Sequence, residues 1–235
     1  MLTVACVYWQ GNFRGRQNIY DVTWVRKLRD MVRRNLNIPH KFVCLSNVNV
    51  PHCDQLIKLK DDLPGYWSKV ELFRPGLFED RVLYLDLDVL VLKSLEPLIN
   101  FDSKFAIMQA CSKVIISKQE GKVRVKRYNS SVMVFDAGVA DLLYTGFSQQ
   151  KRLKFFGDQD WIGHMSTFNN DQDWIGYRMP QLDTFPKQWI KKLRDCPRLQ
   201  PDEDMIIALC MAQCQLPEKN KSVVEKCKWA REIWI

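Results

Sequence analysis

Two aspartates, Asp86 and Asp88, stand between two apolar runs of the sequence. Residues two apart on an extended backbone point to the same side, so both carboxylates would face one ligand. Carboxylate oxygens are hard ligands that suit Mg²⁺ or Mn²⁺, and such an ion neutralises a diphosphate. The same spacing recurs at Asp158/Asp160, Asp171/Asp173 and Asp202/Asp204. Only the first pair lies between core-like runs, where charges are rarely placed without a partner; this favours a metal site over simple capping of a strand end.

The motif Asp-Gln-Asp-Trp-Ile-Gly occurs twice, at residues 158–163 and 171–176. A single repetition thirteen residues apart is not the signature of a solenoid protein. We interpret it as a local duplication in which one copy is redundant.

The elements that must position these residues follow from the apolar periodicity. A helix is expected after Asp21 or Thr23 as N-cap, and a second one at 66–73, ended by Pro75. Buried strands are expected at 2–8, 41–46, 56–59, 82–85 and 89–92. Further strands are expected at 105–109, 113–117, 123–126 and 132–135, with a turn at 120–121 and a helix opening at 139–144. The first 95 residues thus predict an open, Rossmann-like α/β sheet, and the strand-rich middle makes it a mixed, mostly parallel one.

Composition indicates a folded protein with an excess of positive charge. Of 235 residues, 46% are hydrophobic and 26% charged, which excludes a disordered chain. Lys and Arg number 35 against 27 Asp and Glu, a net charge of +8. The basic clusters lie at 26–34, 113–127, 151–154, 187–194 and 219–228. Each could be a solvated face, and together they fit a polyanionic ligand or an acidic membrane surface.

The sequence predicts a cytoplasmic location. The longest apolar runs, 82–92 and 205–212, are too short or too interrupted to span a membrane, and the first eight residues read as a strand, not as a secretory signal. The eight cysteines form no C-x-x-C pair, which favours a reducing compartment. Only three histidines are present, so a multi-histidine metal site is not expected.

Four blocks in sequence order resemble the GT-A glycosyltransferases. They are YWSKVELF (66–73), VLYLDLDVLVL (82–92), YNSSVMVF (128–135) and GDQD (157–160). The chain is most similar to the retaining glycosyltransferase family 8, the group of glycogenin and the bacterial lipopolysaccharide galactosyltransferases. The resemblance implies one GT-A domain over 1–235. Its nucleotide-binding half, 1–95, would end in the D-x-D motif, and 96–235 would form the donor-sugar and acceptor half with a C-terminal tail.

The resemblance also implies roles for single residues. Asp86 and Asp88 match the metal ligands, and Asp86 also borders the donor. Lys69 matches the lysine that lies over the donor's phosphates; the alternative is a solvated helix lysine. The remaining donor-binding positions are Val7 and Tyr8 at the nucleobase, Tyr20 stacked on uracil, and Asn129 and Ser130 at the donor sugar, where a turn before a strand is the alternative.

Both copies of the duplicated motif are candidates for the segment that contacts the transferred sugar. Asp158 and Gln159 follow Gly157 and lie at the better distance from Asn129, so the first copy is favoured. Asp171 and Gln172 lie at the better distance from the downstream Phe-Pro-Lys-Gln-Trp segment at 185–189.

The activity implied is the transfer of a sugar from a UDP-sugar to an unknown glycan, lipid-linked or protein acceptor, with Mn²⁺ or Mg²⁺ and with retention of configuration. Front-face attack by the acceptor would need no strong enzymic base. One departure stands out: the family's C-terminal metal-site histidine has no counterpart in 206–217, where Ala212 is nearest. Cys210 and Cys214 could approach a metal, although buried packing is favoured.

Two alternatives remain open. The absent histidine allows a catalytically weak GT-A domain that binds nucleotide or glycan without turnover. The net charge allows a basic nucleic-acid-binding protein, but the eight tryptophans do not alternate with Lys and Arg on one stripe, so no nucleic acid partner is expected. Because of the basic clusters, we also expect peripheral contact with an acidic membrane at its cytosolic face.

Overall fold

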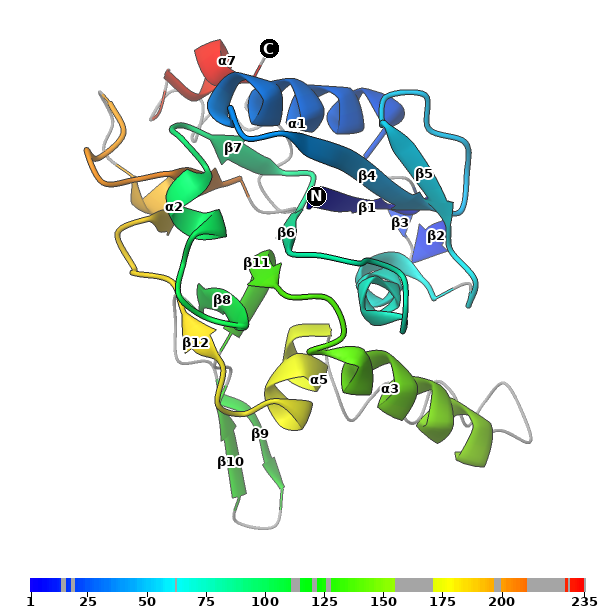
Figure 1. Cartoon of the computed structure of the whole chain (residues 1–235). Coiled ribbons are helices and arrows are strands. Elements are labelled where there is room, and N and C mark those ends of the chain that lie inside the picture. Colours follow the sequence, from blue (N-terminus) through cyan, green and yellow to red (C-terminus); the bar gives the residue numbers. More distant parts are fainter. Residues whose placement is uncertain are drawn as a thin grey trace.

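A computed structural model describes the chain except residues 14–15, 18–19, 62, 111–114, 120–121, 126–127, 155–170, 197–199, 211–226, 228 and 235. Figure 1 shows helices on both sides of a central sheet. The helices are α1 (Val22–Asn35), η1 (Gly65–Phe73, a 3₁₀ helix), α2 (Glu96–Ile99), α3 (Asp141–Lys154), α5 (Asp171–Arg178), η2 (Leu193–Asp195, 3₁₀) and α7 (Trp229–Ile233).

The central sheet has seven strands in the order β12-β8-β11-β6-β1-β4-β5. In chain order these strands are β1 (Leu2–Tyr8), β4 (His40–Ser46), β5 (Gln55–Lys58), β6 (Val82–Leu85), β8 (Phe105–Gln109), β11 (Tyr128–Phe135) and β12 (Asp183–Thr184). All neighbours pair in parallel except β11, which is antiparallel to both β6 and β8. The predicted mixed, mostly parallel α/β sheet is thereby confirmed.

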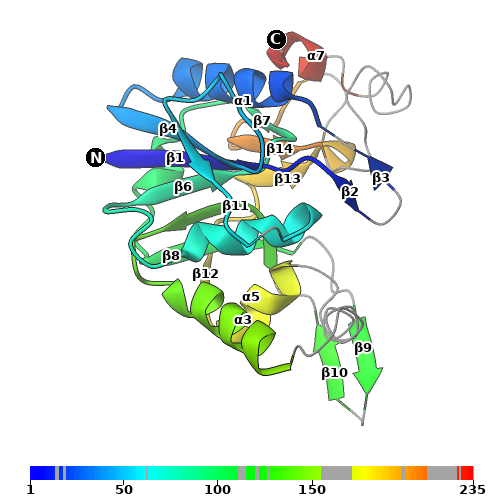
Figure 2. The ribbon, with the colours of Figure 1, turned by 90° about the vertical axis from the view of Figure 1, so that its right-hand side faces the viewer.

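Alternation along the strands sends side chains into two cores, one on each face of the sheet. Val4, Cys6 and Tyr8 of β1 join the core that α1 covers, while Ala5 and Val7 join the core under η1, α3 and α5. Figure 2 shows α1 on one side of the sheet and α3 and α5 on the other. Both faces are covered, which is why the central strands read as nearly continuous apolar runs.

Helix α1 follows its expected pattern. The side chain of Asp21 caps it by accepting a hydrogen bond from the backbone N–H of Thr23 at 2.8 Å. Its buried residues are Trp24, Val25, Leu28, Met31 and Val32, which recur at helical spacing and face the sheet.

A second sheet begins where β6 ends. It consists of β13 (Ile190–Lys192), β14 (Ile207–Leu209) and β7 (Val89–Val91) in that order. The chain therefore leaves the central sheet at Asp86 and enters the second sheet just after Asp88. β14 runs antiparallel to β7, and the N–H of Cys210 donates to the carbonyl of Asp88 at 2.9 Å.

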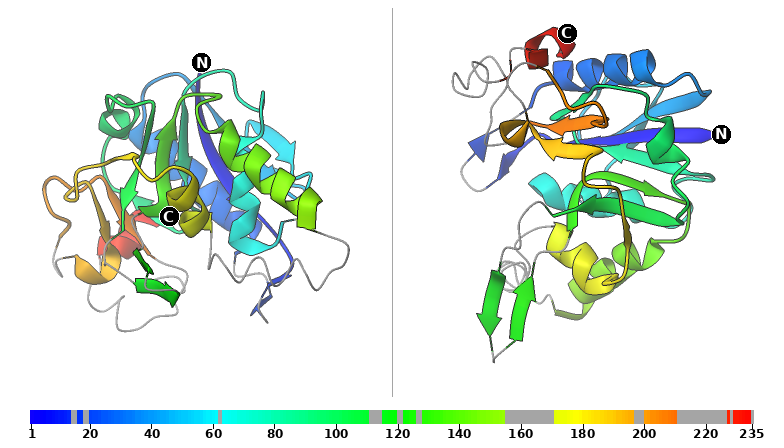
Figure 3. Two further views of the ribbon diagram at one scale, coloured as in Figure 1. Left: turned by 90° about the horizontal axis from the view of Figure 1, so that it is seen from below. Right: turned by 90° about the vertical axis from the view of Figure 1, so that its left-hand side faces the viewer.

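Two short antiparallel pairs lie outside these sheets: β2 (Asn12–Phe13) with β3 (Arg16–Gln17), and β9 (Ile115–Gln119) with β10 (Lys122–Val125). Figure 3 shows β9 and β10 projecting from the body of the protein. This pair is the hairpin expected at 113–126, with β9 shifted by two residues; its turn lies outside the described residues. The sequence did not predict β12, β13, β14 or the helices α2, α5 and α7.

The cysteines behave as predicted where they are described. Cys6, Cys44, Cys53, Cys196, Cys210 and Cys227 are free thiols, all buried except the half-buried Cys53. None of the helices in the described ranges has the length and apolar character needed to cross a membrane.

Candidate active site

Lys69 stands at the centre of a buried cluster of polar side chains. Its ammonium lies 2.8 Å from Oδ1 of Asp86, 3.2 Å from Oγ of Ser130 and 3.7 Å from Oδ2 of Asp171. The Ser130 hydroxyl donates to the same Asp171 oxygen at 2.5 Å. Four elements thus meet here: η1, the turn after β6, β11 and the start of α5.

The strands fix Asp86 and Ser130 relative to each other. The backbone N–H of Asp86 donates to the carbonyl of Ser131 at 2.9 Å, which extends the pairing of β6 with β11 by one step. Tyr84, two residues before Asp86, points to the same side, and its hydroxyl donates to Asp86 Oδ1 at 2.5 Å. Tyr84 was not among the predicted site residues, although its spacing from Asp86 was a usable signal.

A buried carboxylate anchors the helix that carries Lys69. Glu71 accepts hydrogen bonds from the backbone N–H groups of Lys60 at 2.7 Å and Asp61 at 3.0 Å, and lies 3.2 Å from the guanidinium of Arg74. The start of η1 is fixed by Gly65, which has φ of +58° and on which a Cβ would lie 2.5 Å from a ring carbon of Phe13. Lys69 is therefore a positioned residue and not a solvated helix lysine.

The charges of the cluster depend on one another. Burial raises the pKa of Asp171, and the adjacent ammonium of Lys69 opposes this rise. Burial alone would lower the pKa of Lys69, but the carboxylates of Asp171 and Asp86 raise it above its ordinary value. Lys69 is therefore a fixed cation at neutral pH.

Asp88 is 8% exposed and lies next to a second carboxylate. Burial, and then the charge of Asp86, raise the pKa of Asp88 to about 7, while Lys69 and a hydrogen bond with Tyr20 oppose the rise. Two carboxylates held together in a buried place are the environment that a divalent cation stabilises.

The donor set fits a divalent cation that also binds a substrate. No group of three His, Cys, Asp or Glu side chains suited to a metal occurs within the described ranges. Mg²⁺ is often held by only one or two carboxylates, with waters and substrate phosphates completing the shell, and Asp86 and Asp88 supply such a pair. Cys210, which the sequence allowed near a metal, is 3% exposed and therefore packed as favoured. Cys214 and Ala212 lie outside the described residues.

The tyrosines expected at the nucleobase lie together at the end of β1. The hydroxyl of Tyr8 lies 3.5 Å from the carbonyl of Tyr20, and the Tyr20 ring packs edge to face on Trp24 with 4.7 Å between centroids. Burial, followed by the charges of Asp88 and Asp86, raises the pKa of Tyr20 well above its usual value. Tyr20 therefore links the end of β1 to the carboxylate pair.

The side chain of Asn129 forms a local hydrogen bond. Its side-chain oxygen accepts from the N–H of Ser131 at 2.9 Å, the turn-like arrangement that was the alternative for this pair of residues. Its neighbour Ser130 instead faces Lys69 and Asp171.

The second copy of the duplicated motif reaches the cluster. Asp171 begins α5, and within the described part of the chain its Oδ1 is a buried oxygen without a hydrogen-bond partner, as is Oε1 of Gln172. The indole N–H of Trp174 donates to the carbonyl of Leu143 at 2.9 Å, which docks α5 on α3. Asp158 and Gln159 of the first copy lie outside the described residues, so the preference for that copy stays a prediction.

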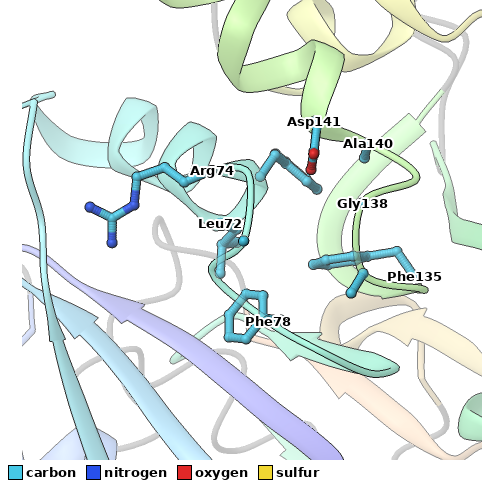
Figure 4. A pocket seen from close by; sticks show the side chains of 10 residues that line it. Leu72, Arg74, Phe78, Phe135, Gly138, Ala140 and Asp141 are labelled. Carbon is cyan, nitrogen blue, oxygen red and sulfur yellow. The ribbon is translucent and has the colours of Figure 1, made fainter.

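Another cavity in the protein is too small to be a substrate-binding site. Figure 4 shows it between Leu72, Phe78, Phe135 and Asp141, with the guanidinium of Arg74 pointing away from it. Its volume of about 10 Å³ leaves room for one water molecule and not for a substrate.

A known protein family matches this chain. The sequence model of glycosyl transferase family 8 matches residues 22–142, more than half of the chain. The chain belongs to glycosyl transferase family 8. It is therefore a glycosyltransferase enzyme, as the sequence blocks predicted. Enzymes of this family generally use a divalent metal, a nucleotide-sugar donor and a glycan acceptor.

Solved structures show the same fold at low sequence identity. The galactosyltransferase LgtC, in complex with donor and acceptor sugar analogs, matches with a TM-score of 0.60 at 13% identity, over 99% of this chain and 95% of that one. GlyE of Streptococcus pneumoniae TIGR4 matches with 0.55 at 14%, over 91% and 56%. The bifunctional glycosyltransferase WbbM matches with 0.58 at 13%, over 99% and 51%, so this family 8 chain spans about half of WbbM. Comparison with curated proteins finds no match.

Proposed function

We propose that this family 8 glycosyltransferase moves a sugar from a UDP-sugar to an acceptor hydroxyl, with retention of configuration and with Mn²⁺ or Mg²⁺. The observation that carries the proposal is the contact of Lys69 with both Asp86 and Asp171. It joins the carboxylate pair after β6 to the acidic start of α5 in one buried site.

Asp86 and Asp88 would hold the metal ion. When bound, the ion supplies positive charge to the diphosphate that leaves the sugar. Lys69 adds a second, fixed positive charge on the same side, and because Asp86 and Asp171 hold it, little reorganisation is needed when the leaving group gains charge.

The donor's other end would lie along the carboxyl edge of β1. Val7 and Tyr8 end that strand and Tyr20 lies against Tyr8, so the uracil ring would bind beside these aromatic side chains. Asn129 and Ser130 would border the sugar, since they begin β11 on the other side of β6.

The sugar's reactive face would meet Asp171. The bond between the anomeric carbon and the diphosphate oxygen breaks, the acceptor oxygen bonds to that carbon, and the acceptor's proton passes to the leaving diphosphate. The sugar gains cationic character during this exchange. The buried Oδ1 of Asp171, which accepts no hydrogen bond from any described residue, would stabilise it, with Gln172 beside it. We therefore assign this role to the second copy of the motif, in place of Asp158 and Gln159.

Calorimetric titration of UDP with and without Mn²⁺, repeated on Asp88→Asn, tests the donor site. Metal-dependent binding that is lost in the variant supports the proposal, and hydrolysis of UDP-sugars would then identify the donor. Binding without any hydrolysis or transfer would instead support a domain that binds nucleotide without turnover. Absence of UDP binding in both conditions would overturn the proposal.

The place of action we propose is the cytoplasm, at the cytosolic face of a membrane. The free thiols of the described cysteines and the basic clusters support this location. Fractionation of cells, with vesicle-binding measurements at low and high salt, tests it: binding to acidic vesicles should weaken as salt screens the charges.

A further inference from the structure

A second cavity opens at the same edge of the sheet as the donor site. Its volume is about 230 Å³. It is lined by the end of β8 and the residues after it, by Phe185, Pro186 and Lys187 after β12, and by Ile190, Lys191, Lys192 and Asp195. Met108, which lines it, pairs with Asn129 across β8 and β11, so the cavity borders the region proposed for the donor sugar.

The most informative residue of this cavity is Lys192. The residue as a whole is 8% exposed, so most of its side chain is packed, and it lines the cavity. No residue in the described ranges forms an ion pair or side-chain hydrogen bond with its ammonium. A lysine whose stem is packed and whose ammonium has no carboxylate partner is suited to bind an anion that enters the cavity. Lys192 falls within the basic cluster 187–194, which the sequence alone allowed to be a solvated face; for Lys192 that interpretation is wrong.

The neighbouring charges do not satisfy Lys192. The ammonium of Lys191 forms an ion pair with Asp202. Asp195, the acidic residue of the cavity lining, lies 3.6 Å from the guanidinium of Arg194 and is 57% exposed, so its charge is shared and solvated. Lys187 adds a further positive charge to the lining. The cavity is therefore a concave, positively charged site.

We propose that this cavity binds an anionic group, a phosphate or a carboxylate, on the acceptor glycan, with Lys192 as its principal partner. The inference rests on the proposed function, because it places the cavity on the acceptor side of the donor sugar. Acceptors without a negative charge would give the Lys192 ammonium no anionic partner and would bind less well.

Calorimetric titrations with glucose, glucose 6-phosphate and glucuronate test the site directly. The wild-type protein should bind one or both of the charged sugars at least roughly tenfold more tightly than glucose, the range expected for a hydrogen bond to a charged group. Lys192→Met should abolish this difference, and Lys192→Arg, which keeps the charge, should restore most of it. The matched control is Lys104→Met, which removes an exposed lysine just before the opposite end of β8.

Preference for one charged sugar identifies the anionic group, and equal binding of glucose in the wild type overturns the proposal. So does unchanged discrimination in Lys192→Met. UDP titrations of the same proteins separate this proposal from the donor assignment: loss of UDP binding with retained, Lys192-dependent sugar phosphate binding would refute the donor site alone. Thermal unfolding of Lys192→Met shows whether the variant is folded; methionine keeps an unbranched apolar stem and the substitution breaks no ion pair, so the Tm should be unchanged.

Discussion

Two buried lysines at one edge of the sheet illustrate opposite ways of holding a positive charge. Lys69 has an 11% exposed side chain and lies between the carboxylates of Asp86 and Asp171. Lys192 is 8% exposed and lines a cavity without a partner among the described residues. The first charge is stabilised before any ligand binds, which suits a group that acts in the transition state. The second has no carboxylate partner before an anion binds, which suits recognition.

Lys69→Met should give the largest effect on activity. Loss of this fixed charge removes stabilisation of the leaving diphosphate, and donor turnover should fall by roughly a hundredfold to a thousandfold. Steady-state hydrolysis or transfer with a UDP-sugar measures it, with Lys104→Met as the control. A fall of less than threefold would show that Lys69 takes no part in the transfer step. The contrast between a lysine that acts in the transition state and one that recognises a ligand would then be lost.

Asp171→Asn tests whether the carboxylate that pairs with Lys69 also stabilises the reacting sugar. Turnover should fall by roughly a hundredfold while UDP binding stays within a fewfold, because the carboxylate acts on the reacting sugar and not on the nucleotide. Asp158→Asn is the matched variant from the first copy of the motif. A larger loss in Asp158→Asn than in Asp171→Asn would assign the site to the first copy instead.

Stability should separate the two lysines in opposite directions. Lys69→Met leaves two buried carboxylates without their cation and should lower the free energy of unfolding by about 3 kcal/mol. Lys192→Met removes an unpaired charge and should leave the free energy unchanged or raise it. Urea unfolding in buffer free of phosphate measures both. Equal destabilisation by the two substitutions would show that Lys192 has a partner after all.

Much of this arrangement is readable from the sequence, because strong apolar periodicity fixes the central strands. The runs before and after Asp86 and Asp88 place these carboxylates at the switch between two sheets. Strands of two or three residues, such as β12 and β13, carry too few side chains for a period to show. The burial of Lys192 was equally hidden, since a lysine within a basic run is ordinarily solvated, and only its packing in β13 distinguishes it.

Tyr84→Phe should have the smallest effect. It tests how strongly the hydrogen bond from Tyr84 orients Asp86, which pairs with Lys69. The hydroxyl of Tyr84 donates to Asp86 Oδ1, and the ring centroid lies 5.7 Å from the ammonium of Lys69; phenylalanine keeps the ring and loses only the hydrogen bond. A partner of this kind orients a metal-binding carboxylate, so the apparent affinity for Mn²⁺ in UDP binding should fall by roughly tenfold.

Tyr177→Phe, at a tyrosine that is 56% exposed on α5, controls for the loss of a hydroxyl. The apparent affinity for Mg²⁺ should fall in parallel in Tyr84→Phe, because the hydrogen bond acts on the carboxylate and not on one particular ion. An unchanged metal dependence in Tyr84→Phe would mean that Lys69 alone orients Asp86. The ion pair of Lys69 would then be sufficient to hold the Asp86 carboxylate in place. Lys192 forms no ion pair with a described residue, so the two lysines would differ even more clearly.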